Sequence, residues 1–297
     1  MDFCDKAVIF EKLRQEMLGE VTRCKSIKGR KRVKTDPVNK KLWGDLYPQL
    51  LRNLKTVADE ERWTAEKILD CRLRLFYCAL VVNLETRNEV VPYDYMDFAR
   101  RVGELWERLC KICWDAPVNR AAKRLPPISF ATVKSDMLER VEAIVSAGKP
   151  SNQDAVIAEV NRLIELLGNI NLKEDEYCSF GKRKLVIDFK SGFGSNEKGN
   201  TERLLTVAKI YGALPERHEC VLVVRASEED GNAYLGTLRA SGLWDVRCGP
   251  GAYKFIQQVT GFDLASWIGT NVDFRADMEK TAYQHLDQHR LTKYLEW

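Results

Sequence analysis

The sequence predicts an α/β protein in which helices flank a mixed β-sheet, with a helical subdomain in front of it. From residue 42 to about 144, apolar residues recur mainly at helical spacing. Residues 184–190 alternate in character, as in a β-strand, and residues 220–225 form the continuous apolar run of a buried strand. A polar break at residues 147–152 divides the chain, so we expect a helical subdomain over 1–150 and an α/β core over 151–297.

Composition limits the class of protein without identifying it. The 297 residues are long enough to bury a substantial core, and the net charge of +4 permits a nucleic-acid partner without requiring one. No apolar run approaches the ~18–20 residues that span a bilayer, and the first residues lack a secretory pattern. We therefore expect no membrane partner and a cytoplasmic, intracellular location.

Cysteine and histidine give no convincing metal site. The nine cysteines stand mostly among apolar neighbours, which is typical of reduced core thiols. Cys110 and Cys113 form a CxxC within a helical pattern, but no second pair completes a zinc site. His285 and His289 share one helix face and lack an evident third ligand.

The amino-terminal half begins with an amphipathic helix expected over residues 4–20. A basic segment follows, with seven cations between Arg23 and Lys34, and its low apolar content indicates a flexible arm along a phosphate backbone. Its candidate DNA contacts are Lys28, Arg30, Lys31 and Arg32. The alternative is a solvated loop or an address signal. Asp36-Pro37 is expected to break the chain, and the clearest later helices cover residues 65–84 and 94–114.

The carboxy-terminal half alternates between helix and strand. We expect a helix over about 153–167, a hairpin ending in the 184–190 strand, and a helix reaching about residue 211. The buried strand at 220–225, a helix near 233–241 and a strand at 243–248 follow. Helices within 251–267 and 273–295 close the chain.

The chemistry of the sequence centres on the strand that contains Asp188 and Lys190. Period-two alternation points both side chains to one face of an apolar strand, where burial is costly unless each charge has a partner. The alternative is a solvent-facing salt bridge on an edge strand. An acidic turn, Glu174-Asp175-Glu176, precedes Asp188 by one hairpin and can bring a second carboxylate beside it. Two carboxylates and a lysine suit a hard divalent cation such as Mg²⁺.

These residues resemble the signature of the PD-(D/E)xK nuclease superfamily, most of all that of type II restriction endonucleases: an acid, a hairpin, then (D/E)-x-K. Glu-Asp stands here where the family usually has Pro-Asp. The resemblance implies a restriction-endonuclease-like sheet over roughly residues 154–268. It also implies that Asp175 and Asp188 bind Mg²⁺, and that Lys190 orients or helps to deprotonate the attacking water. Which acid of the turn takes part stays open.

The resembled family often adds an acid from the helix before the hairpin, for which Glu159 and Glu165 are candidates; the alternative is that both are surface glutamates. Beyond the strand, Gly194 to Thr201 nearly spells a phosphate-binding P-loop. Asn200 stands where that loop needs its lysine, so we do not expect ATP hydrolysis. Asn196, Lys198 and Asn200 are instead candidate DNA contacts, and the alternative is a turn that ends in a helix cap.

The sequence thus predicts a Mg²⁺-dependent, sequence-specific endonuclease that cleaves double-stranded DNA, of the type II restriction class. One hairpin supplies one catalytic centre whereas a double-strand cut needs two, so we expect a homodimer. The alternatives are a repair or structure-selective nuclease, and a non-catalytic DNA-binding or scaffold protein in which Asp188 and Lys190 form only an ion pair.

Overall fold

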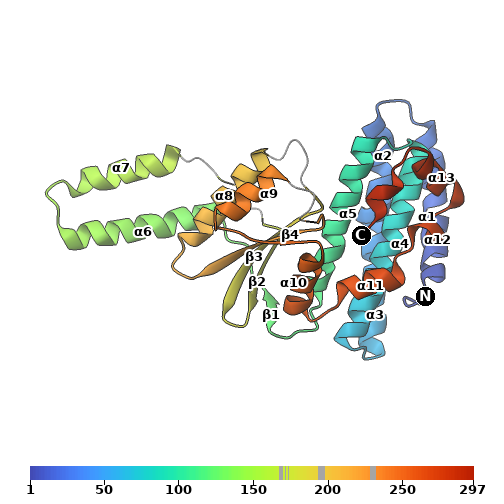
Figure 1. The fold of residues 1–297 in the computed structure, drawn as a ribbon, viewed down its shortest axis with the longest axis horizontal. Coiled ribbons are helices and arrows are strands. Elements are labelled where there is room, and N and C mark those ends of the chain that lie inside the picture. Colours follow the sequence, from blue (N-terminus) through green and yellow to red (C-terminus); the bar gives the residue numbers. More distant parts are fainter. Residues whose placement is uncertain (167–169, 171, 173, 193–197, 228–231) are drawn as a thin grey trace.

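The computed structural model describes residues 1–166, 170, 172, 174–192, 198–227 and 232–297. Helices dominate the first part of the chain (Figure 1). They are α1 (Lys6–Ser26), α2 (Lys31–Asn39), a π-helical segment η1 (Lys40–Leu46), α3 (Tyr47–Glu60), α4 (Ala65–Val90) and α5 (Tyr95–Asp115). A short strand β1 (Ala122–Arg124) and the helices α6 (Phe130–Gly148) and α7 (Gln153–Leu166) follow. The helices predicted over residues 65–84 and 94–114 are α4 and α5.

The second part alternates strands and helices as the sequence predicts. The elements are β2 (Glu176–Phe180), β3 (Arg183–Lys190), α8 (Lys198–Gly212), β4 (His218–Val224), α9 (Ala233–Ala240) and β5 (Asp245–Cys248). Four helices, α10 (Pro250–Thr260), α11 (Leu264–Asn271), α12 (Phe274–Asp277) and α13 (Lys280–Gln288), and a 3₁₀ turn η3 (Thr292–Leu295) then follow.

The five strands form one mixed sheet in the order β1-β2-β3-β4-β5. β1, β2 and β3 pair antiparallel, whereas β3, β4 and β5 pair parallel. The first residue of β2, Glu176, lies opposite Ile187, so β3 continues for residues 188–190 beyond its partner while it still pairs with β4. This carboxyl end of β3 is the position of the Asp-x-Lys pair.

Helices cover both faces of the sheet. α5 and α10 pack on one face, and α8 and α9 pack on the other (Figure 1). Leu185, Ile187 and Phe189 belong to the core on the α5 side, whereas Val186 belongs to the core on the α8 side. The predicted alternation along β3 is therefore confirmed, and the mixed sheet flanked by helices is confirmed with it.

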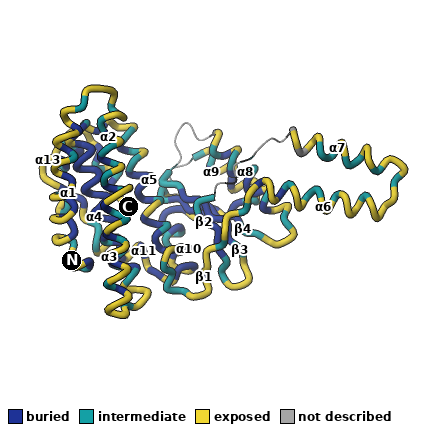
Figure 2. Tube along the Cα trace, turned by 180° about the vertical axis from the view of Figure 1, so that it is seen from behind, coloured by how far each residue is buried: buried dark blue, intermediate teal, exposed yellow. Residues whose placement is uncertain are grey.

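The larger core joins the two ends of the chain. It contains residues of α1, α4 and α5 together with residues of α10, α11 and α13, and both termini lie in this helical part (Figure 1). Residues on both sides of position 150 thus share one core, and β1 comes from the first 150 residues. By contrast, α6 and α7 form a hairpin that extends away from the sheet and is mostly exposed (Figure 2).

The basic segment is more ordered than the sequence suggests. The prediction of a flexible arm is wrong for Lys31 and Arg32, which begin α2, and Asp36-Pro37 lies inside that helix rather than breaking it. Acids from distant parts of the chain explain the order, because Lys25 pairs with Glu89 at 2.6 Å and Lys31 with Asp94 at 2.9 Å. Lys28 and Arg30 remain exposed in the connection between α1 and α2.

Candidate active site at the end of strand β3

Asp188 is a buried carboxylate with two cationic partners. Its side chain on β3 is only 3% exposed. One carboxylate oxygen pairs with the Lys190 ammonium, and the other accepts a hydrogen bond of 2.8 Å from Nη2 of Arg203 on α8. The interpretation as a solvent-facing salt bridge on an edge strand is wrong, because β3 lies between β2 and β4 and helices cover both faces. A buried charge of this kind needs partners, and here it has them.

Lys190 is held as a cation. Its ammonium also donates a hydrogen bond of 2.8 Å to the backbone carbonyl of Phe189. Burial acts to lower the pKa of Lys190, but the charges of Asp188 and Glu107 outweigh it, so the pKa is raised. A lysine that keeps its proton is suited to orienting water and balancing negative charge, and less suited to removing a proton.

Asp175 lies immediately before β2 and attaches to the same end of β3. Its N–H donates to the carbonyl of Ile187 at 3.1 Å, and its Oδ2 accepts from the N–H of Phe189 at 2.8 Å. The carboxylate thereby accepts a hydrogen bond from β3 just beyond the last residue pair of β2 and β3. Its other oxygen accepts a hydrogen bond of 2.5 Å from the Lys111 ammonium of α5. This brings the Asp175 carboxylate to the backbone of the residue that follows Asp188.

The other two acids of the turn have different surroundings. Glu176 is buried and receives a hydrogen bond of 2.7 Å from Arg124 of β1. Glu174 faces Tyr211 on α8, and burial raises the pKa of its carboxyl. Among the three acids, Asp175 is the one whose side chain accepts a hydrogen bond from the backbone at the end of β3.

A further acid, Glu107, approaches from α5. This helix crosses the end of β3 so closely that a Cβ at Gly103 would collide with the Ser191 hydroxyl. Trp106 and Trp114 pack edge-to-face on Phe189, with ring centres 6.4 and 5.4 Å apart. Glu107 stands four residues after Gly103 and four before Lys111, so the three share one helix face.

The electrostatics of Glu107 place it in the same cluster. Burial raises its pKa to about 7, and the carboxylates of Asp175 and Asp188 contribute to the rise although Lys190 and Lys111 oppose it. Sequence reasoning missed Glu107, Lys111 and Arg203. One signal was available in the sequence. Glu107 is a charged residue beside the apolar face of α5, to which Trp106, Cys110 and Trp114 belong.

The remaining candidates lie elsewhere or outside the description. Glu159 and Glu165 are exposed on α7, in the hairpin that extends away from the sheet (Figure 2). Asn196 lies outside the described residues, and the side chain of Lys198 is likewise not described. Asn200 lies half-buried in the first turn of α8, the helix that supplies Arg203.

The donor set suits a hard divalent cation by chemistry. Asp175, Asp188 and Glu107 offer carboxylate oxygens from three separate elements, and Mg²⁺ prefers such oxygens while it retains several waters. In this arrangement the oxygens of both aspartates face cationic or amide donors. Within the described ranges, no three histidine, cysteine or acidic side chains are already grouped to hold a metal. Metal binding at Asp188 therefore requires one of its cationic partners to move.

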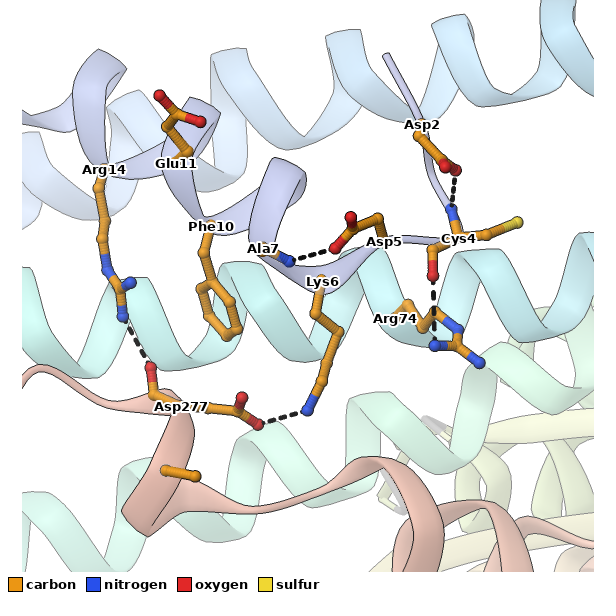
Figure 3. A pocket seen from close by; sticks show the side chains of 11 residues that line it. Asp2, Cys4, Asp5, Lys6, Ala7, Phe10, Glu11, Arg14, Arg74 and Asp277 are labelled. Atoms are coloured by element: carbon orange, nitrogen blue, oxygen red, sulfur yellow. Dashed lines mark hydrogen bonds and ion pairs between the residues drawn. The ribbon is translucent and has the colours of Figure 1, made fainter.

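A second charged site, at the amino terminus, has a structural explanation. Figure 3 shows a pocket between α1, α4 and α12 in which Lys6 points to Asp277 at 2.7 Å. Arg14 donates to the backbone carbonyl of Asp277 at 2.7 Å and pairs with Glu85 at the same distance. These cations tie α1 to the carboxy-terminal helices, so the ion pairs of this pocket help to hold the fold together.

No protein-family model, curated protein or solved structure matches the chain. Among the described residues, no helix combines the length and the apolar character needed to cross a membrane.

Proposed function

We propose that the protein is a Mg²⁺-dependent endonuclease that cleaves double-stranded DNA, of the type II restriction class that the sequence resembles. The observation that supports the proposal is the convergence of Asp175, Asp188, Lys190 and Glu107 at the end of β3. These groups come from a turn, a strand and a helix, and they surround the end of β3 beyond its pairing with β2. Glu107 interacts electrostatically with the other three.

In this proposal each residue has a distinct task. Asp175 and Asp188, with Glu107 as a further ligand, would hold Mg²⁺, which activates water and offsets negative charge on a phosphate. Lys190, which its neighbours keep protonated, orients the attacking water and balances charge on the phosphorane. Burial is the main cause of the raised pKa of Glu107, and the carboxylates of Asp175 and Asp188 add to it, so a cation bound here would stabilise the ionised form of Glu107.

The cations around the site favour an anionic substrate. Lys111, Lys190 and Arg203 surround the carboxylates, and Arg203 is partly exposed at the edge of the site. Each of these cations pairs with a site carboxylate, so when a metal ion takes the carboxylates, a phosphodiester can supply the negative charge that replaces them.

A digest of plasmid and genomic DNA with Mg²⁺ tests the proposal, with EDTA and the variant Asp188→Asn as controls. We expect discrete fragments from the wild type and none from either control, with DNA binding of the variant kept within about tenfold. Smearing or cleavage of junctions alone would favour a repair or structure-selective nuclease. Absence of cleavage with every divalent metal would favour a non-catalytic DNA-binding protein.

A further inference from the structure

A cation-rich cavity of about 480 Å³ lies between α2, α4 and α5, away from the acids at the end of β3. Five cationic side chains line it against three carboxylates: Lys31, Arg32, Arg87, Arg100 and Arg101 against Asp36, Asp97 and Glu104. The cavity wall therefore carries an excess of positive charge.

The carboxylates of the wall are already engaged. Asp36 pairs with Arg32 at 3.1 Å, and Glu104 pairs with Arg100 at 3.0 Å and with Arg101 at 3.3 Å. Asp97 pairs with Lys31. Among the residues that the structure describes, these pairs leave one cation of the cavity, Arg87, without an acidic partner.

Arg87 is the residue that points to a ligand. It is only 7% exposed, and it makes no ion pair with any residue in the described part of the chain. Its guanidinium lies over the ring of Tyr93, 5.2 Å from the ring centre, and its Nε has no hydrogen-bond partner there. A buried cation without a counter-charge is costly, and an anion in the cavity would supply the missing charge.

Arg101 supports the same conclusion. Its Nη2 donates a hydrogen bond of 2.9 Å to the side-chain oxygen of Asn39, but its Nε has no hydrogen-bond partner among the described residues. Burial lowers the pKa of Arg101, and the neighbouring charge of Arg87 lowers it further. Two buried guanidinium groups that repel each other are relieved by an anion that both can reach.

We propose that this cavity binds a phosphate group of the DNA strand whose backbone is cut at the end of β3. Several guanidinium groups around one cavity match the oxygens of a phosphate, which accept paired hydrogen bonds from arginine forks. The assignment to DNA rests on the proposed nuclease function, whereas the assignment to phosphate rests on the cavity alone.

The position of the cavity along α5 connects it to the candidate active site. Spacings of three and four residues place Asp97, Arg100, Glu104, Glu107 and Lys111 on one face of this helix. Six residues separate Arg101 from Glu107, which corresponds to about 9 Å along the helix axis. A phosphate bound in the cavity would therefore lie within a few nucleotides of a phosphodiester at the end of β3.

The first experiment follows the thermal unfolding of the full-length protein with inorganic phosphate, against chloride at equal ionic strength. We expect phosphate to raise the Tm of the wild type and of Arg183→Gln, a control at the opposite end of β3 whose arginine pairs with Glu219. Arg101→Gln and Arg87→Met should lose this response. Without phosphate, Arg87→Met should be at least as stable as the wild type, because it removes a buried charge that has no partner.

The second experiment measures binding of a short DNA duplex in EDTA, by fluorescence anisotropy at several salt concentrations. We expect Arg101→Gln to weaken binding about tenfold and to reduce the salt slope by about 1, as loss of one phosphate contact predicts. The exposed Arg100→Gln provides a second variant in case Arg101→Gln folds poorly.

The outcomes separate the claims. An equal phosphate response in wild type and Arg101→Gln, or strong destabilisation by Arg87→Met without phosphate, would overturn the cavity as an anion site. A lost phosphate response with unchanged DNA binding would overturn the DNA assignment and indicate a free phosphate compound as ligand. If both experiments succeed while the wild type cuts no DNA, the cavity stands and the proposed nuclease function fails.

Discussion

The guanidinium of Arg203 on α8 lies 2.8 Å from Oδ2 of Asp188 on β3, and the Lys190 ammonium occupies the other oxygen of the same carboxylate. The two cations differ in freedom. The side chain of Lys190 is 14% exposed, whereas that of Arg203 is 31% exposed and lies closer to solvent. Arg203 is therefore the partner that can leave Asp188 more readily when a metal ion binds there.

This relationship predicts that Arg203→Ala binds divalent metal more tightly than the wild type does. With its competitor removed, Asp188 should bind Mn²⁺ at least about fivefold more strongly, which is the lower end of the range by which one bound group typically changes the affinity for another. Electron paramagnetic resonance of Mn²⁺ without DNA measures this directly. Lys209→Ala, which removes an exposed cation from the same helix, should leave the affinity unchanged. Equal affinities of Arg203→Ala and the wild type would contradict the prediction.

Glu107 should make the metal-free protein less stable as the pH rises towards neutrality. Its pKa is about 7 in the folded state against 4.5 ordinarily, so between these values the folded state binds more protons than the unfolded state. Stability is then greatest below about pH 4.5 and falls by about 3 kcal/mol as the pH rises to 7, because each pKa unit corresponds to about 1.4 kcal/mol.

Urea unfolding in EDTA at pH 5 and pH 7.5 measures this effect as the difference between the wild type and Glu107→Gln. The variant should lack this part of the pH dependence, and Glu104→Gln, one turn earlier on α5 and more exposed, should retain it. If Glu107→Gln followed the wild-type pH profile, Glu107 would not be the buried acid that the geometry indicates.

Local patterns were sufficient to predict most of the sheet. The alternation of residues 184–190 and the apolar run at 220–225 are properties of the strands themselves; β3 covers the first range, and β4 covers the second up to Val224. The pairing of Asp188 with Lys190 follows from the same alternation, because period two places residues i and i+2 on one face.

The remainder of the site depends on tertiary packing that no local pattern encodes. Glu107 and Lys111 reach Asp175 only because α5 crosses the end of β3 at Gly103, more than sixty residues earlier in the sequence. The basic segment shows the same limit in reverse. The sequence shows only that Lys31 belongs to a run of charged residues. Its pairing with Asp94 depends on where Asp94 lies in the folded protein.

Cys4 and Cys71 should form a disulfide under mild oxidation. Their sulfur atoms lie 3.0 Å apart, and Cys4 is partly exposed, so an oxidant such as hydrogen peroxide can accept the two hydrogens of the thiols. The new bond would tie the amino-terminal segment to α4 and stabilise the protein by about 2 kcal/mol or more, by constraining the unfolded chain. Thermal unfolding after oxidation measures the gain. Cys4→Ser should gain nothing, and an equal response of the two proteins would exclude this pair.

The protein should act as a homodimer that cuts both strands of a site with two-fold symmetry. The described residues bring Asp175, Asp188 and Lys190 together once, at the end of β3, whereas a double-strand cut requires two hydrolyses on antiparallel strands. Two copies related by a two-fold axis place one centre on each strand, and closed dimers of this symmetry are the commonest oligomers. Light scattering should give twice the mass of one chain.

Mixing wild type with an excess of Asp188→Asn then provides a sharper test of the dimer. Mixed dimers hold one working centre, so they should convert supercoiled plasmid to the nicked form rather than the linear form. A monomer that nicks one strand at asymmetric sites would exclude the dimer, and it would favour a repair-type nuclease built on the same acids and lysine.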